Sequence, residues 1–227
     1  MHSFHYISEK DIQHLTVADD ELLLVLIQVS ALHSSFSDWK NLLSKEEMDK
    51  AMSFRADADR NTYACAHAFL RTILSVLLQC KPTELFFLKE TSGKPYVQSA
   101  NIMSGNQTIH FSLSHSGNYV ALCFHTQHTV GVDVEQINPS SDYSQIAESY
   151  FSEQEKLDYN QAENKLIFFL KQWTAKEASG KVTGDGIAKL QSLKLPEGYV
   201  STCHIEEQAV LSACYPEGSV SKNYYII

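Results

Sequence analysis

Apolar positions divide the chain into short segments separated by polar turns. The run LLLVLIQV at residues 22–29 is apolar throughout, which is typical of a strand buried on both faces. It is too short to span a membrane, and the acidic ADDE that precedes it at 18–21 is unlike the positively charged start of a signal peptide. The pattern therefore predicts a buried core strand over 22–30.

Two pairs of helices are predicted further along the chain. Each pair begins with a short helix that carries a capping box, in which a serine is followed three residues later by a glutamate. These short helices are predicted over 44–54 (SKEEMDKAMSF) and 151–160 (FSEQEKLDYN). Each pair continues with a longer helix in which apolar residues recur at about helical spacing. The longer helices are predicted over 60–80 and 164–179.

The remaining apolar segments are predicted as strands. They are 84–90, two strands within 108–125 around a Ser-Gly-Asn turn, 129–137, 190–195, 199–205, 209–215 and 223–227. The order of two helices followed by strands occurs twice. We therefore expect an α/β (α+β) fold with two similar subdomains, residues 1–127 and 128–227.

Composition and charge narrow the class of protein. The 227 residues are 44% hydrophobic and 20% charged, which is typical of a globular protein. The net charge of -9 argues against a general affinity for nucleic acid or anionic membranes, because both need a basic face. The five cysteines form no CxxC pair and no two are close in sequence, so a disulfide framework or zinc ribbon is not indicated. We expect a cytoplasmic protein with reduced thiols.

Two carboxylates lie two residues apart in the segment GVDVE at 131–135. On a strand, Asp133 and Glu135 would point to the same face with Cα atoms roughly 6.6 Å apart. A hard divalent cation such as magnesium relieves the repulsion between two such carboxylates. A half-exposed strand with a polar face carries the same pattern, so the alternative of an ordinary strand stays open.

The segment WTAKEASGK at 173–181 places charged groups at the end of an apolar helix. Trp173, Glu177 and Lys181 are spaced by four residues and so share one helical face. A carboxylate and an ammonium on one face suit a phosphate ester bound with a metal. A solvated Glu–Lys pair at a helix end explains the same residues without any ligand.

Two further segments offer polar groups. In FSLSHSGNY at 111–119, Ser114 and His115 are neighbours on a predicted strand and point to opposite faces, so a Ser–His nucleophile is not expected. Ser114, His115 and Ser116 have the alternative role of hydrogen-bonding an anion. In SGKPY, the turn between Gly93 and Pro95 presents Lys94, which is either a phosphate contact or an ordinary turn lysine.

The order of these segments resembles that of the 4'-phosphopantetheinyl transferases, specifically the large pseudodimeric surfactin type. That family is marked by a GKP turn, an SHS segment, a G-[IV]-D-x-E strand and a W-x-x-K-E-x-x-x-K helix. All four occur here, and the resemblance covers about residues 40–195. It implies two similar halves in a pseudo-twofold arrangement, with the active site at their interface. Because each half supplies what a partner subunit would, we expect a monomer.

The resemblance also implies a reaction and the residues that perform it. Phosphopantetheine would pass from coenzyme A to a serine of an apo acyl or peptidyl carrier protein, releasing adenosine 3',5'-bisphosphate. Magnesium, or manganese in its place, would be held by Asp133, Glu135 and Glu177, with Glu177 also the general base. The implied coenzyme A contacts are Lys50, Lys94, Ser114, His115, Lys176 and Lys181, and of these Lys181 and His115 would act in catalysis.

Two other functions fit the same residues. One is a metal-dependent hydrolase that cleaves the pyrophosphate of coenzyme A without a carrier. The other is a non-catalytic module that binds coenzyme A or a carrier protein, although such a module has no need of the base Glu177. One departure from the family pattern is Ser112, which stands where the family often has asparagine before the Leu-Ser-His run.

Overall fold

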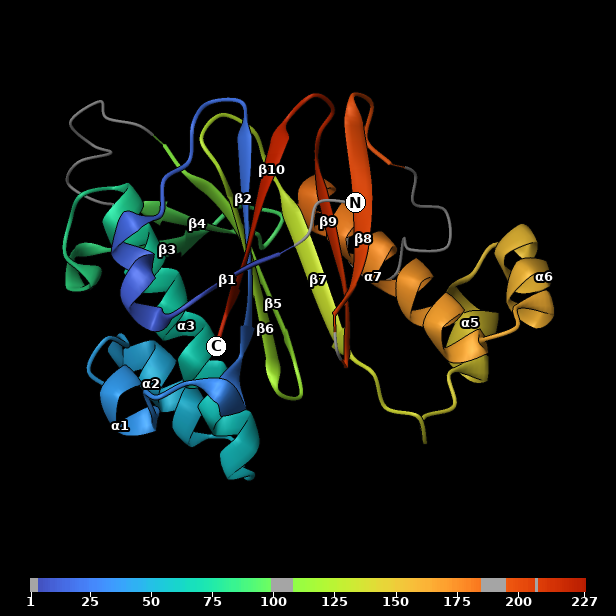
Figure 1. Ribbon diagram of the computed structural model, residues 1–227, viewed down its shortest axis with the longest axis horizontal. Coiled ribbons are helices and arrows are strands. Elements are labelled where there is room, and N and C mark those ends of the chain that lie inside the picture. The colour runs from blue at the N-terminus through green and yellow to red at the C-terminus, as the bar shows by residue number, and fades with distance from the viewer. Residues whose placement is uncertain (1–3, 99–107, 185–194, 207) are drawn as a thin grey trace.

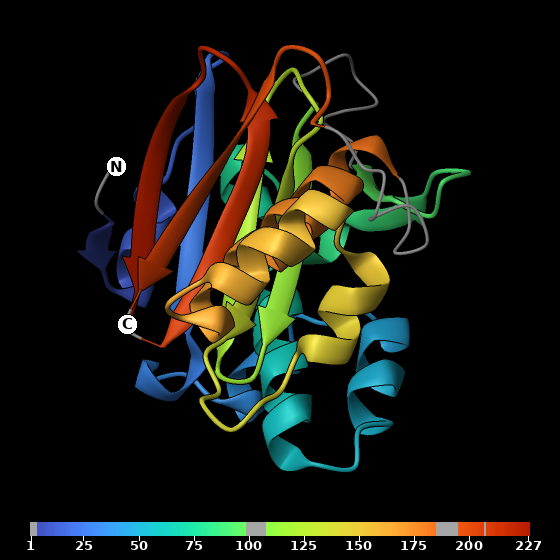
Figure 2. The ribbon, with the colours of Figure 1, turned by 90° about the vertical axis from the view of Figure 1, so that its right-hand side faces the viewer.

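Two β-sheets pack face to face, and helices cover the outer face of each, so that the layers run helix, sheet, sheet, helix (Figures 1 and 2). This arrangement is that of a computed structural model, which describes residues 4–98, 108–184, 195–206 and 208–227. The mixture of helices and sheets in two parts confirms the predicted fold class.

The first sheet has five strands in the order β1-β10-β2-β6-β5. The strands are β1 (His5–Ile7), β2 (Glu21–Gln28), β5 (His110–Ser116), β6 (Tyr119–His125) and β10 (Val220–Ile226). The central β2 pairs parallel with β10 and antiparallel with β6. Alternate residues of β2 belong to two cores: Leu23, Val25 and Ile27 face the helices, whereas Leu22, Leu24 and Leu26 face the second sheet. Burial on both faces explains the uninterrupted apolar run and confirms the predicted core strand.

The helices of the first half are α1 (Phe36–Trp39), α2 (Lys45–Met52) and α3 (Asp57–Leu77), with the 3-10 turns η1 (Glu9–His14), η2 (Val29–Ala31) and η3 (Pro82–Glu84) and the hairpin of β3 (Phe86–Lys89) and β4 (Pro95–Gln98). A buried ion pair joins α2 to α3, since Arg71 Nε lies 2.7 Å from Glu47 Oε2. Burial opposes ionisation of Glu47, but hydrogen bonds from His67 and Arg71 prevail and lower its pKa to about 2. This pair fixes the helix that carries Lys50.

The second sheet has three strands in the order β7-β9-β8, and α7 packs across it. The elements are β7 (Gly131–Gln136), α5 (Ser144–Tyr150), α6 (Glu153–Gln161), α7 (Lys165–Thr183), β8 (Tyr199–Glu206) and β9 (Ala209–Pro216). Both predicted capping boxes are confirmed: Ser44 accepts the backbone N–H of Glu47, and Ser152 that of Glu155. The capped ends fix where α2 and α6 begin.

The last strand of the chain, β10, is not part of the sheet formed by the other strands of the second half. β10 pairs with β1 and β2, which places it inside the first sheet. The strands of each sheet are therefore not consecutive in the sequence. The division into residues 1–127 and 128–227 stays a prediction. The helices α1 and α5 and the strands β1 and β4 were not predicted. The strand predicted over 190–195 lies outside the described residues except for Leu195, which is not in a strand.

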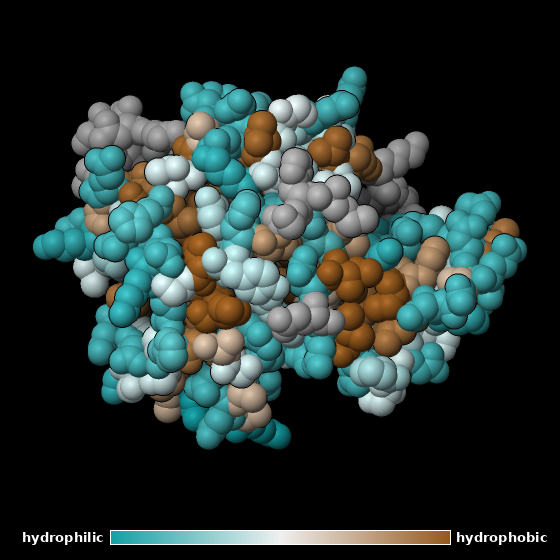
Figure 3. All heavy atoms as spheres, in the orientation of Figure 1, coloured by the Kyte–Doolittle hydropathy of each residue, from teal (hydrophilic) through white to brown (hydrophobic). Residues whose placement is uncertain are grey.

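The surface in the view of Figure 3 is largely hydrophilic, with apolar atoms gathered in separate patches. Helix α6, whose sequence is EQEKLDYNQ, contributes mostly polar residues to this face. Among the described helices, none is both long enough and apolar enough to cross a membrane.

A buried histidine makes the fold sensitive to acid. His125 is 1% exposed, and its Nδ1 accepts hydrogen bonds from the backbone N–H groups of Gln127 and His128. Burial lowers the pKa of His125, and the neighbouring His128 and His110 lower it further. The unfolded chain therefore binds a proton at a higher pH, near the ordinary histidine pKa of about 6.5. His125 contributes stability above that pH, and this stability is lost as the pH falls through the folded pKa.

We expect the melting temperature to fall as the pH decreases below about 6.5. His125→Asn keeps an acceptor oxygen but does not titrate, so its melting temperature should depend less on pH than that of the wild type. His33→Asn at an exposed position serves as the control and should follow the wild type. Parallel pH profiles for the wild type and His125→Asn would contradict the assignment.

Candidate active site

Strands β5 and β7 lie side by side although they belong to different sheets. Side-chain hydroxyls on β5 cross the gap between them. Ser112 Oγ accepts the backbone N–H of Val132 at 3.1 Å. The residue that departs from the family pattern therefore contributes to joining the two halves of the molecule.

The next two serines on the same face of β5 bind the two carboxylates of β7. Ser114 Oγ donates to Asp133 Oδ1 at 2.7 Å, and Ser116 Oγ donates to Glu135 Oε2 at 2.6 Å. The expected common face for Asp133 and Glu135 follows from the period of two along a strand. The sequence suggested that these hydroxyls bind an anion. In the structure both serines donate to carboxylates of the protein itself.

Helix α7 carries Glu177 and Lys181 onto β7. The close approach needs Gly131, because a Cβ at that position would lie 1.9 Å from the carbonyl oxygen of Ala178. Lys181 Nζ donates to the carbonyl oxygen of Val132 at 2.8 Å and to Asp133 Oδ1 at 2.9 Å. The helix thus adds a carboxylate and an ammonium to the pair of carboxylates on the strand.

These carboxylates are poorly neutralised. Burial raises the pKa of Glu135, and the charges of Asp133 and Glu177 raise it further against the hydrogen bond from Ser116. Burial also raises the pKa of Glu177, followed by the charge of Asp133, whereas Lys181 lowers it. Asp133 Oδ2 and Glu177 Oε1 are buried and have no hydrogen-bond partner among the described residues. Buried oxygens of this kind are costly unless a cation or proton compensates them.

The donor set suits a magnesium ion that is shared with a phosphate. The described residues contain no group of three His, Cys, Asp or Glu side chains that could hold a metal ion by themselves. Magnesium is usually held by one or two carboxylates together with water and substrate phosphates, so a complete protein cage is not required. The unpartnered oxygens of Asp133 and Glu177 are the ligand type that this ion prefers.

His115 lies on the opposite face of β5 from the two serines. Its ring meets the ring of Tyr63 edge to face at 6.3 Å, and Tyr63 packs against His67 at 4.2 Å. Solvent reaches His115, yet desolvation by the surrounding protein lowers its pKa, and the charges of His67 and Lys181 add to this effect. A neutral imidazole is therefore the main form at neutral pH.

The other predicted cations lie at separate places. Lys94 Nζ donates to the carbonyl oxygen of Val130 at 3.2 Å, and burial lowers its pKa. It lines a cavity of about 630 Å³ together with aromatic residues of β4 and β5. Lys50 is exposed on α2, where its ammonium lies 5.2 Å from the ring centroid of Phe54.

Lys176, which the resemblance implies as a coenzyme A contact, is paired with an acidic residue in the structure. Its ammonium forms an ion pair with Glu155 at 3.0 Å, and the residue is 9% exposed. The pair ties α6 to α7, so the buried charge already has a carboxylate partner. One helical step of about 100° separates Lys176 from Glu177, which explains why neighbouring residues of one motif face different surroundings.

Sequence reasoning missed Ser112 and Ser116 as residues that contact the strand of carboxylates. The signal that points to them is the serine at every second position of β5, from Ser112 to Ser116, since such residues share a face. What the sequence did not reveal is that this face meets β7.

Comparisons with known proteins identify the family. Residues 129–221 match the 4'-phosphopantetheinyl transferase superfamily, and residues 30–127 match a family described as 4'-phosphopantetheinyl transferase, N-terminal. The chain is 33% identical to 4'-phosphopantetheinyl transferase HetI of Nostoc sp. over 184 residues, which cover 80% of this chain and 76% of the relative.

Two further relatives agree. The chain is 25% identical to 4'-phosphopantetheinyl transferase Sfp of Bacillus subtilis, over 75% of this chain and 78% of the relative. It is 30% identical to 4'-phosphopantetheinyl transferase AcpT of Salmonella typhi, over 64% of this chain and 73% of the relative. The chain belongs to the 4'-phosphopantetheinyl transferase superfamily and is thus an enzyme that transfers phosphopantetheine from coenzyme A to carrier proteins. The resemblance drawn from the sequence motifs is confirmed.

Proposed function

We propose that Asp133, Glu135 and Glu177 hold a magnesium ion with the pyrophosphate of coenzyme A, and that manganese can replace it. The observation that carries this proposal is the pair of buried, unpartnered oxygens on Asp133 and Glu177 beside Lys181. When bound, the ion would neutralise phosphate oxygens and so favour attack on phosphorus.

Glu177 is the proposed general base. The pKa of Glu177 is raised toward neutral pH, and a base with such a pKa accepts a proton from the carrier serine more readily. The serine oxygen then bonds to the phosphorus that bears pantetheine, and the bridging P–O bond breaks. Adenosine 3',5'-bisphosphate leaves, and Lys181 stabilises the negative charge that develops on it.

The remaining coenzyme A contacts are proposals at separate points of the surface. Ser114 donates to Asp133, and His115 follows it on the opposite face of β5, whereas Lys94 lines the cavity near β4 and Lys50 projects from α2. We assign Lys50 and Lys94 to the nucleotide end of coenzyme A, as the resemblance to the family implies. Lys176 stays a predicted contact of coenzyme A, and its ion pair with Glu155 joins α6 to α7.

We also propose that the enzyme acts as a monomer in a reducing, cytoplasmic setting. The strand β7 and the helix α7, which together supply the carboxylates and Lys181, come from one chain. All five cysteines are free thiols. Size-exclusion chromatography with light scattering tests the monomer.

Intact-mass spectrometry of an apo carrier protein tests the reaction. The carrier, coenzyme A, magnesium and the enzyme are incubated together, with a chelator added to a parallel sample. We expect the carrier to gain the mass of one phosphopantetheine group, and the chelator to prevent the gain. Breakdown of coenzyme A without modification of several carriers would instead favour a hydrolase, and bound but intact coenzyme A would favour a binding module.

A further inference from the structure

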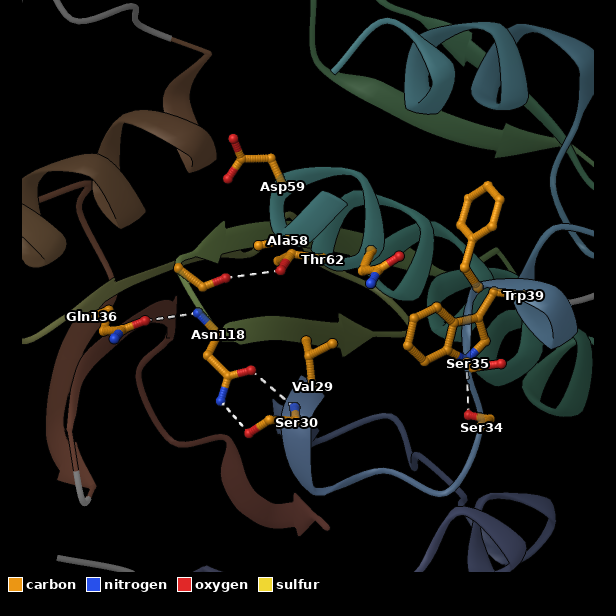
Figure 4. A pocket seen from close by; sticks show the side chains of 13 residues that line it. Val29, Ser30, Ser34, Ser35, Trp39, Ala58, Asp59, Thr62, Asn118 and Gln136 are labelled. Carbon is orange, nitrogen blue, oxygen red and sulfur yellow. Dashed lines mark hydrogen bonds between the residues drawn. The ribbon is translucent and has the colours of Figure 1, made fainter. Parts of the chain in front are cut away.

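The turn between β5 and β6 is held by hydrogen bonds from three other elements. Thr62 Oγ1 on α3 donates to the carbonyl oxygen of Gly117 at 2.8 Å. The backbone N–H of Asn118 donates to Gln136 Oε1 on β7 at 2.7 Å. The side chain of Asn118 accepts from the backbone N–H of Ser30 at 2.9 Å and donates to its hydroxyl at 2.7 Å. Figure 4 shows these side chains around the turn.

The turn borders a cavity of about 530 Å³, which Thr62 and Gln136 also line (Figure 4). Gly117 has a φ of +53°, and a Cβ there would lie 1.9 Å from Gln136 Oε1. The backbone of the turn therefore sits directly against the side chain that follows Glu135 in sequence.

Ser116 is the last residue of β5 before this turn, and its hydroxyl lies 2.6 Å from Glu135 Oε2. The two carboxylates of β7 differ in how they are held. Asp133 Oδ1 receives both Ser114 and Lys181. For Glu135, the hydroxyl of Ser116 is the one side-chain donor recorded among the described residues.

We propose that Ser116 is a positioning residue that orients Glu135 toward the metal and pyrophosphate. Its hydroxyl engages Oε2 and so leaves Oε1 as the oxygen that can face an ion. The clamped turn keeps the hydroxyl in place, because Gly117 and Asn118 are tied to α3 and β7. The inference rests on the proposed role of Glu135 in holding magnesium.

Loss of the hydroxyl should weaken metal use more than coenzyme A binding. In Ser116→Ala, Glu135 loses its donor and its carboxylate is free to rotate. Removing a partner that orients a metal ligand typically costs about 10- to 100-fold in metal affinity or activity. We expect kcat to fall and the magnesium concentration for half-maximal rate to rise within that range, while KM for coenzyme A at saturating magnesium changes little.

Two further variants test whether the effect comes from the hydroxyl that orients Glu135 or from a general change in packing. Ser116→Thr keeps the hydroxyl and should restore most of the magnesium dependence. Ser149→Ala removes an exposed hydroxyl of α5 that donates to a backbone carbonyl, and it should behave like the wild type. The rise in melting temperature on adding magnesium is measured for each protein with coenzyme A present and no carrier protein, and it should be smaller for Ser116→Ala than for Ser116→Thr.

The outcomes distinguish this inference from the proposed function. A magnesium-dependent wild type with an unchanged Ser116→Ala, or a Ser116→Thr as impaired as Ser116→Ala, would overturn the inference alone. A wild type whose transfer needs no divalent ion would overturn the proposed metal role and this inference with it. A weaker response to magnesium in Ser116→Ala, together with a nearly normal response in Ser116→Thr, would support both the proposed metal role and this inference.

Discussion

Glu177→Gln should reduce transfer to a carrier protein by about 10²–10⁴-fold, the range typical of a lost general base. The substitution keeps the size of the side chain but removes the negative charge and the ability to accept the serine proton. The measurement is kcat for carrier modification by intact-mass spectrometry at saturating magnesium. KM for coenzyme A should change less than kcat, because the nucleotide contacts lie elsewhere.

The same substitution should leave the fold intact and raise its stability. Burial and the nearby charge of Asp133 raise the pKa of Glu177, so the folded state holds its proton to a higher pH than the unfolded state. Stability from this group is present below the unfolded pKa and lost as the pH rises through the folded pKa. A neutral side chain avoids that loss at neutral pH, so the melting temperature of Glu177→Gln should equal or exceed that of the wild type.

A matched control comes from an exposed glutamate. Glu163→Gln lies just before α7 and should change neither kcat nor the melting temperature measurably. Near-normal transfer by Glu177→Gln would refute its assignment as base. A large fall in the melting temperature of Glu177→Gln would refute the view that the buried carboxylate is destabilising.

Gly131→Ala should impair both stability and transfer, because it forces α7 away from β7. The added Cβ would lie 1.9 Å from the carbonyl oxygen of Ala178, and a backbone atom in a helix cannot move aside alone. Overpacking of this kind costs about 1–3 kcal/mol, and we expect the upper end. A shift of about 1 Å at Glu177 and Lys181 is sufficient to lower the rate by about 100-fold.

A second substitution tests whether the backbone contact is the cause. The added Cβ would also meet Val182 Cγ2 at 3.2 Å, a contact that Val182→Ala removes. The double variant Gly131→Ala with Val182→Ala should therefore recover little of the lost stability in a urea titration. Full recovery would show that the side-chain contact, and not the carbonyl of Ala178, sets the distance between helix and strand.

Local sequence patterns were sufficient to predict many of the helices and strands. The serine and glutamate of each capping box marked the starts of α2 and α6, since capping depends on residues three apart. The unbroken apolar run marked β2, because a strand buried on both faces lacks polar alternation and the run is short for a helix. Elements with weak patterns, such as the short α5 and the edge strand β1, were missed because tertiary contacts stabilise them.

The carboxylates and the lysine were visible in sequence because their spacing follows the periods of a strand and a helix. Asp133 and Glu135 share a strand face, and Glu177 and Lys181 share a helix face, as the structure shows. The same reasoning did not predict that Lys176 and Lys181 pair with different carboxylates. A helix period states which residues share a face but not which neighbour that face meets, and here Lys176 meets Glu155.

The sequence by itself determined the family, the helices with strong caps, and the types of residue that carry the chemistry. Only the tertiary structure decided that β5 meets β7, that serine hydroxyls hold the carboxylates, and that β10 returns to the first sheet. The physical reason is that the backbone hydrogen bonds of a helix and its capping bonds join residues only a few positions apart. Pairing between distant strands depends on how the whole core is buried, and that burial involves residues from both ends of the chain.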